Sequence, residues 1–242
     1  MERYVVRVWL PDRPGALGLV ASRIGAVRAE IVGIEILERG AGRAIDELVV
    51  ELPDPTLLGL LIDEVKAVDG VDVEDVRPAP AALRDPRVDA LETVATLVEL
   101  SSDHAVLEAV LEHVRADFEG DWAAVVDVGG PPEVRVARGS VPSAARLTAF
   151  VDPGQPTATA DTGPDEVASA PLTGVGLDLV LGRHGRPFRA RERRQLCALG
   201  RIVGARLRQL AETPPMAPGS ASRIPVPADG EAAGRANRSA IG

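Results

Sequence analysis

The sequence predicts an α+β fold in which two antiparallel sheets follow one another, each flanked by helices. Two observations predict it. Within residues 3–76, runs rich in β-branched residues alternate with helical stripes in the order β-α-β-β-α-β. After a proline-rich stretch at residues 78–90, a second series of helices and strand pairs begins and continues to residue 210. The chain is long enough for two small domains.

The first strand is predicted over residues 3–10, where apolar residues dominate as in an inner strand. A helix is predicted over residues 15–28, because it carries a one-sided apolar stripe made of Leu17, Val20, Ile24 and Val27. The two elements meet at a short polar corner, residues 12–18. Pro14 presets the first helical turn and Gly15 allows close backbone approach, so the corner is a tight strand-to-helix turn.

The next elements complete the first half of the fold. Residues 31–37 and 44–52 read as two strands of a hairpin across a glycine-containing turn. A helix follows Pro55, and residues 71–76 alternate as an edge strand does. This order is the split βαβ, ferredoxin-like arrangement, with two helices on one face of the sheet. We expect a second copy of the domain to cover the other face.

The corner at residues 12–18 has the chemistry of an anion site. Backbone N–H groups at a helix start all point out of the helix N-terminus, which is the positive end of the helix dipole. Such a group of donors could hold a carboxylate. A proline-glycine helix start that binds nothing has the same local sequence. Both interpretations remain open on local chemistry alone.

Residues 1–78 resemble the ACT domain, a regulatory module attached to amino-acid biosynthetic enzymes. The resemblance rests on the β-α-β-β-α-β order, the corner Asp12-Arg13-Pro14-Gly15-Ala16-Leu17 and the helix that follows. It implies a homodimer with an effector, often an amino acid, at the interface against this corner. The N–H groups of residues 15–17 would hold its carboxylate, Asp12 its amino group, and Arg13 would add charge or contact the neighbouring subunit. The predicted site residues are Asp12, Arg13, Pro14, Gly15, Ala16 and Leu17, with Gly33 or Ile34 from the second strand.

A semi-rigid linker is predicted at residues 79–87, followed by a second domain at residues 88–210. Two helices are predicted over residues 88–117, with Asp103 as an N-cap. Four strands are predicted at residues 122–128, 133–139, 166–172 and 177–183. A short helix is predicted at residues 143–151 and a long helix at residues 191–209. Residues 211–242 contain too few aliphatic residues to bury a core, so we predict a disordered tail.

The second part resembles a GAF domain, a relative of the PAS fold. The resemblance rests on Val106 to Leu111 in the opening helix, on the strand pair around Leu172 and Leu181, and on Arg186 to Glu192 before the last helix. It implies an antiparallel sheet flanked by helices that also pair two subunits. The cyclic-nucleotide signature and the bilin cysteine of this family are missing, so no ligand or cofactor is carried over.

Other reactive side chains do not assemble into a site. His104, His113 and His184 lack metal-ligand spacing, and Cys197 is predicted to be a buried structural thiol on an apolar helix face. Asp46 and Glu47 should point to opposite faces of their strand, so they cannot act as an acid–base pair. The arginines Arg189, Arg191, Arg193 and Arg194 fit a solvated face or a contact with an acidic partner or phosphate. We therefore expect no catalytic or metal residues.

Composition narrows the possible partners. A net charge of −9 and 2% aromatic residues disfavour nucleic-acid binding. A single cysteine and the lack of a signal peptide or long apolar run indicate a cytoplasmic protein that does not bind membranes. The sequence thus predicts a non-catalytic, small-molecule-sensing regulatory protein that acts through an unknown protein partner. The alternative is a dimerisation or scaffold protein without a ligand.

Overall fold

The computed structural model describes residues 1–79, 86–131, 133–151 and 164–212, and it confirms the α+β class. It contains two four-stranded antiparallel sheets, with strand orders β2-β3-β1-β4 and β6-β5-β8-β7. Most of the predicted linker and the predicted tail beyond residue 212 lie outside the described residues; residues 211 and 212 belong to the last helix, Ala190–Glu212. Residues 1–212 form one unit by their internal contacts. No helix within the described ranges is long and apolar enough to cross a membrane.

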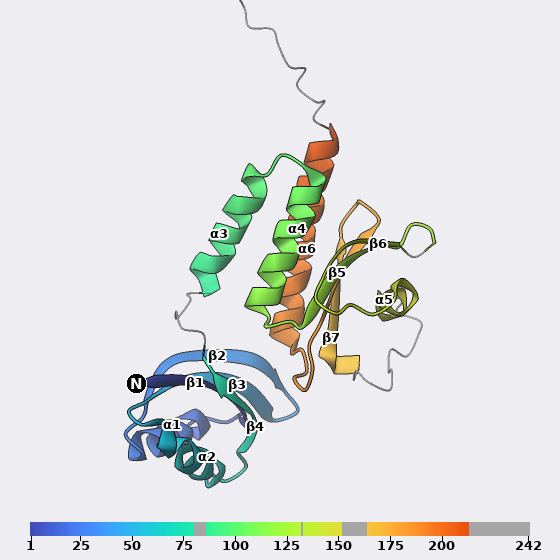
Figure 1. The fold of residues 1–242 in the computed structure, drawn as a ribbon. Coiled ribbons are helices and arrows are strands. Elements are labelled where there is room, and N and C mark those ends of the chain that lie inside the picture. The colour runs from blue at the N-terminus through green and yellow to red at the C-terminus, as the bar shows by residue number, and fades with distance from the viewer. Residues whose placement is uncertain (80–85, 132, 152–163, 213–242) are drawn as a thin grey trace, which may run out of the picture. The chain divides into compact units, whose positions relative to one another are not determined.

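The first sheet is built as the sequence predicts, with the apolar strand β1 inside it and β4 at an edge (Figure 1). Its strands are β1 Glu2–Pro11, β2 Glu30–Gly40, β3 Arg43–Leu52 and β4 Asp72–Pro78. Helices α1 (Ala16–Ala26) and α2 (Leu58–Lys66) cover one face, and a 3-10 turn at Pro55–Leu57 precedes α2. Their buried aliphatic stripes pack on alternate residues of β1 and β3 because successive strand side chains point to opposite faces.

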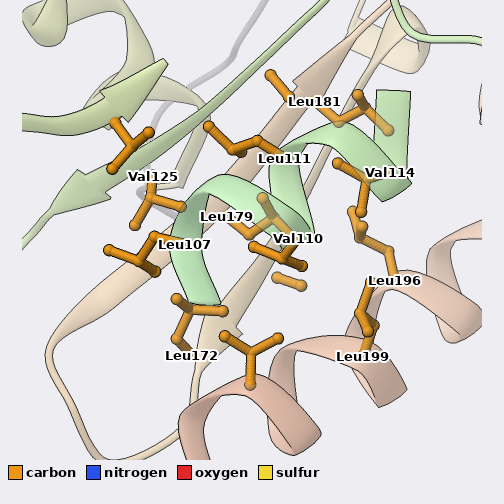
Figure 2. Close-up of a cluster of buried hydrophobic side chains, with 14 of the residues drawn as sticks. Leu107, Val110, Leu111, Val114, Val125, Leu172, Leu179, Leu181, Leu196 and Leu199 are labelled. Atoms are coloured by element: carbon orange, nitrogen blue, oxygen red, sulfur yellow. The ribbon is translucent and has the colours of Figure 1, made fainter. Parts of the chain in front are cut away.

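The second sheet has helices on both faces. Its strands are β5 Trp122–Asp127, β6 Glu133–Arg138, β7 Val167–Leu172 and β8 Leu177–Gly182, and its helices are α3 Pro86–Glu99, α4 Asp103–Asp117, α5 Ala144–Val151 and α6 Ala190–Glu212. Helices α4 and α6 lie side by side on one face, and α5 lies on the other (Figure 1). Figure 2 shows the aliphatic core, in which Leu107 and Leu111 of α4 meet Leu179 of β8.

Two glycines allow α6 to approach β7 closely. A Cβ on Gly204 would lie 2.6 Å from both the nitrogen and the oxygen of Thr173, and one on Gly200 would lie 2.8 Å from the carbonyl oxygen of Pro171. These neighbours are backbone atoms, which cannot rotate away as a side chain can. The helix therefore rests directly on the strand backbone along this side.

Two local predictions are wrong. Ser102, not Asp103, caps α4, because its Oγ accepts a hydrogen bond from the N–H of Ala105 at 3.2 Å and Asp103 is already the first helical residue. Cys197 is exposed rather than buried. It lies beside buried Leu196 on α6, one position off the stripe that packs on the core.

The face of the first sheet opposite α1 and α2 meets other residues of the same chain. Arg7 of β1 donates from Nη1 to the carbonyl oxygen of Pro187 at 3.0 Å. Arg191, in the first turn of α6, donates to Glu35 of β2 at 2.7 Å. The sequence predicts a second copy on this face, but the segment leading into α6 occupies part of it.

Candidate functional site

The corner between β1 and α1 holds an uncapped helix start. The N–H of Asp12 donates to the carbonyl of Gly42 at 2.9 Å, and the N–H of Arg13 donates to Pro11 at 2.8 Å, which fixes the turn. Gly15 occupies the N-cap position with φ 85° and ψ −13°, a left-handed conformation that glycine adopts without steric cost. No side chain caps the helix. The first-turn amides are therefore left to other partners.

Two of these amides have no partner within the described residues. The N–H of Ala16 reaches Arg13 at 3.3 Å and that of Leu19 reaches Gly15 at 3.0 Å, whereas no hydrogen bond from Leu17 or Gly18 is seen there. Free N–H groups at a positive helix end attract anions. The expectation placed the donors at residues 15–17; among the described residues no hydrogen bond is seen from the N–H of Gly15 or Leu17, nor from that of Gly18, whereas Ala16 reaches Arg13.

The predicted corner residues divide into an exposed group and an anchoring group. Asp12, Arg13, Pro14 and Gly15 are exposed. Ala16 is buried and Leu17 is half-buried against the core of the first sheet. The side chains of Ala16 and Leu17 thus hold the corner to the fold, and Leu17 offers its backbone N–H.

Asp46 is a feature of this region that the sequence analysis did not assign to the site. It lies on β3 opposite Val8 of β1 and Ile36 of β2, on the face that α1 and α2 cover. Its side chain is 3% exposed, and its Oδ1 is buried without a hydrogen-bond partner in the described part of the chain. The available signal was its position between Ala44 and Leu48, where the strand pattern calls for an apolar residue.

The charges around Asp46 come from the corner and from β2. Burial raises the pKa of the Asp46 carboxyl, Arg39 partly offsets this increase, and Asp12 adds to it. Arg39 is itself paired with Asp12, with 3.7 Å between Nε and Oδ1. Asp12 therefore already has a cation beside it, whereas Asp46 makes no ion pair among the described residues.

The two β2 residues of the predicted site separate onto opposite faces. Ile34 pairs with Leu48 and shares the face of Asp46, where its side chain is 50% exposed. Gly33 pairs with Val49, and a Cβ placed on it would lie 3.2 Å from Cγ2 of Val49 on the other face. Neighbouring strand residues point to opposite faces, and the register shift between Ile31 and Gly33 decides which face each of the two takes. Ile34 thus lies on the face of the sheet that α1 covers, whereas a side chain at position 33 would lie on the opposite face.

The opposite face carries a buried ionic cluster that the sequence analysis also missed. Arg7 is 1% exposed, donates from Nε to Glu47 at 2.9 Å, and lies 3.8 Å from Glu192 of α6. Arg77 of β4 reaches Glu47 at 3.0 Å and Glu119 at 2.7 Å. As predicted, Asp46 and Glu47 point to opposite faces.

The arginines at the start of α6 find acceptors within the chain. Arg189 pairs with Glu74 and Arg191 with Glu35. Arg193 donates to the carbonyls of Val167 and Asp165. The acidic partner considered from the sequence is thus supplied by the first sheet for two of these arginines.

The histidines form no metal site. His104 lies 3.7 Å from Glu108 and His184 lies 3.6 Å from Glu166, both on the surface, and His113 contacts Thr93. Among the residues that the structure describes, no group of three or more His, Cys, Asp or Glu could hold a metal ion.

Comparison with known proteins gives no family assignment. No family model matches the chain, and no curated protein matches it. Solved structures similar to part of the chain include the ACT domain from GTP pyrophosphokinase of Chlorobium tepidum, with 19% identity, a TM-score of 0.27 and coverage of 32% of this chain and 97% of that one. An uncharacterized protein from Thermotoga maritima matches with 21% identity, a TM-score of 0.27 and coverage of 33% and 98%. An unknown protein from Galdieria sulphuraria matches over 87% of this chain and 92% of that one, with 13% identity and a TM-score of 0.32.

Proposed function

We propose that this chain is a non-catalytic regulatory protein that binds a small carboxylate effector, an amino acid or a similar molecule, at the β1–α1 corner. The observation that carries the proposal is the uncapped start of α1, where the N–H groups of Leu17 and Gly18 are free beside the left-handed Gly15. A carboxylate bound there would satisfy both donors and complement the helix dipole. Ile34 would line the same side of the sheet.

Binding at the corner would be relayed through the second sheet. The ACT-like part would receive the effector, and the GAF-like part would pass the signal to a second subunit and to an unidentified protein partner. Ionic contacts of Arg7, Arg189 and Arg191 join the first sheet to the segment that begins α6. A shift in the sheet would therefore act directly on that helix.

A dimerisation or scaffold protein without a ligand is the second candidate. It is favoured by large apolar side chains that remain exposed on the single chain, namely Ile34 and Ile36 on β2 and Leu91 and Val98 on α3. Such surfaces suit contact with a protein. Both candidates predict a homodimer, so only ligand binding separates them.

A thermal-shift screen of the full chain against the twenty amino acids tests the proposal. A ligand that binds the folded state raises the melting temperature by mass action, so at least one amino acid should produce a concentration-dependent increase. If no amino acid changes the melting temperature while light scattering shows a dimer, the scaffold hypothesis is correct.

Two variants at one position locate the site. Gly15→Asp places a negative charge where the effector carboxylate would lie and should abolish the shift. Gly15→Asn is the matched control, because Asn and Asp both tolerate the left-handed conformation and differ here mainly in charge. Asn should retain a measurable shift. Equal responses from the two variants would place the effector elsewhere.

A further inference from the structure

We propose that Asp46 accepts the ammonium group of the effector, so that the corner selects zwitterionic amino compounds over plain carboxylates. The inference rests on the proposed function and names the ligand chemistry at that site. It assigns the amino group to a buried carboxylate on β3, in place of the exposed Asp12 that the sequence suggests.

Asp46 is a buried carboxylate with an unsatisfied oxygen in the described part of the chain. Buried charged groups in proteins are almost always paired or hydrogen-bonded, because removal from water is costly. Asp46 is 3% exposed, yet its Oδ1 has no hydrogen-bond partner among the described residues. An ammonium group brings three N–H donors and a positive charge, which is the complement that this oxygen lacks.

Asp46 and the free amides of α1 lie on the same side of the first sheet. Asp46 lies on the face covered by α1, one alternate residue along β3 from Ala44, and Ala44 pairs with Leu10 near the end of β1. The charge that raises the pKa of its carboxyl beyond the effect of burial is Asp12 of the corner. Donors for a carboxylate at the start of α1 and an acceptor for an ammonium on β3 therefore lie on the same side of the sheet.

Arg39 is the cation whose charge acts on Asp46. Arg39 lowers the pKa of Asp46 but forms its ion pair with Asp12, at 3.7 Å. Its side chain is 61% exposed, so it does not reach into the buried position. The positive charge of Arg39 favours the ionised form of Asp46, but no hydrogen bond joins the two side chains in the described part of the chain.

The side chain of the effector faces apolar surface. Ile36 pairs directly with Asp46 across β2 and β3, and Ile34 lies two residues further along the same face. Their side chains are 41% and 50% exposed. An effector bound to Asp46 would cover this surface with an aliphatic side chain, so amino acids with apolar side chains should bind more tightly than charged ones.

Isothermal titration of the full chain tests the assignment with each amino acid that binds and with its α-hydroxy acid analogue, which keeps the carboxylate and lacks the amine. We expect the wild-type protein to bind the amino acid roughly tenfold or more tightly than the analogue, since a charged hydrogen bond to a buried group is worth at least this ratio. Asp46→Asn should remove this preference. Asp12→Asn, the control at the exposed carboxylate of the same corner, should keep it.

The outcomes separate the two proposals. If the wild-type protein binds the amino acid and the α-hydroxy acid equally, or if Asp46→Asn keeps the preference, Asp46 does not hold the amine and the effector site stands without it. If neither compound binds, the proposed function itself fails. The comparison of the two ligands on the wild-type protein needs no variant, so it decides the question even if Asp46→Asn folds poorly.

Discussion

Arg7 of β1 donates a hydrogen bond from Nε to Oε1 of Glu47 on β3 at 2.9 Å, in a position where the arginine is almost completely buried. The same guanidinium donates to the carbonyl of Pro187, which precedes α6. The Arg7 side chain thus connects two neighbouring strands with the segment that leads into α6.

Loss of the Arg7 guanidinium should be strongly destabilising. Arg7→Met keeps much of the volume but leaves Glu47 and Glu192 with less compensation, and removal of one partner of a buried pair costs about 3–5 kcal/mol. Urea unfolding should show this decrease in the free energy of unfolding. Arg23→Ala, which breaks an exposed pair with Glu64, is the control and should cost about 1 kcal/mol or less. Equal effects of the two variants would contradict a buried structural role for Arg7.

Asp46 and its neighbour Glu47 should affect stability with opposite dependence on pH. The folded-state pKa of Asp46 is raised by burial, so the folded protein binds the extra proton and stability falls as the pH rises from the unfolded to the folded pKa. Burial also opposes the charge of Glu47, but Arg77 and Arg7 outweigh it and lower its pKa, so its contribution is lost as the pH falls.

Unfolding measured from pH 3 to pH 8 checks these signs. Relative to wild type, Asp46→Asn should gain stability as the pH rises above about 4, the ordinary range of an aspartate carboxyl. Glu47→Gln should be least stable relative to wild type at neutral pH and approach it in acid. Parallel curves for the two variants would show that these carboxylates do not differ in environment.

Alanine at two glycines should have effects of opposite sign. Gly204→Ala would press a methyl group against the backbone of Thr173 and should destabilise the protein by about 1–3 kcal/mol. A Cβ on Gly25 of α1 would meet no atom within 4 Å, so Gly25→Ala should stabilise the helix by roughly 0.5–1 kcal/mol. Thermal unfolding of both variants measures the difference, and stabilisation by Gly204→Ala would show that α6 does not rest on β7.

The exposed apolar residues of β2 and α3 form two candidate surfaces for dimerisation. We expect the wild-type chain to be a homodimer by light scattering, and charges placed on a buried interface to dissociate it. Ile34→Glu tests the first sheet, and a Leu91→Glu, Val98→Glu double variant tests α3. A dimer that survives all three substitutions would show that pairing uses another surface, and a monomeric wild-type chain would contradict the dimer itself.

The order and type of the elements could be predicted because local periodicity determines them. The stripe of α1 is visible in the sequence and the structure confirms it. The alternation predicted for β4 is wrong, because a register shift against β1 places Val73 and Val76, three residues apart, against the same core. The partners of Arg7 could not be predicted, because Glu192 lies at the far end of the described chain. A charged residue between Val6 and Val8 in an inner strand was the available signal.

The candidate site was predictable only in part, for the same reason. The corner is a local sequence feature, so a helix start there could be predicted, but the structure begins the helix at Ala16 and not at residue 15, with Gly15 as a left-handed N-cap. Asp46 joins this region through strand pairing, since its neighbour Ile36 lies across a hairpin turn. Gly33 and Ile34 separate because neighbouring strand residues point to opposite faces, whereas the face that each takes depends on a register shift between Ile31 and Gly33 that the sequence does not indicate.

The consecutive acids Asp46 and Glu47 also restrict how β3 can align in its sheet. A slip of one residue would exchange the faces of the whole strand, placing Glu47 among the aliphatic side chains beneath α1 and removing it from Arg7. The slip would carry Asp46 to the face of Arg7, but it would bury Glu47, whose carboxylate in the native alignment is paired with both Arg7 and Arg77. The pair of Arg7 and Glu47 therefore acts against a misfolded alignment as well as stabilising the native one.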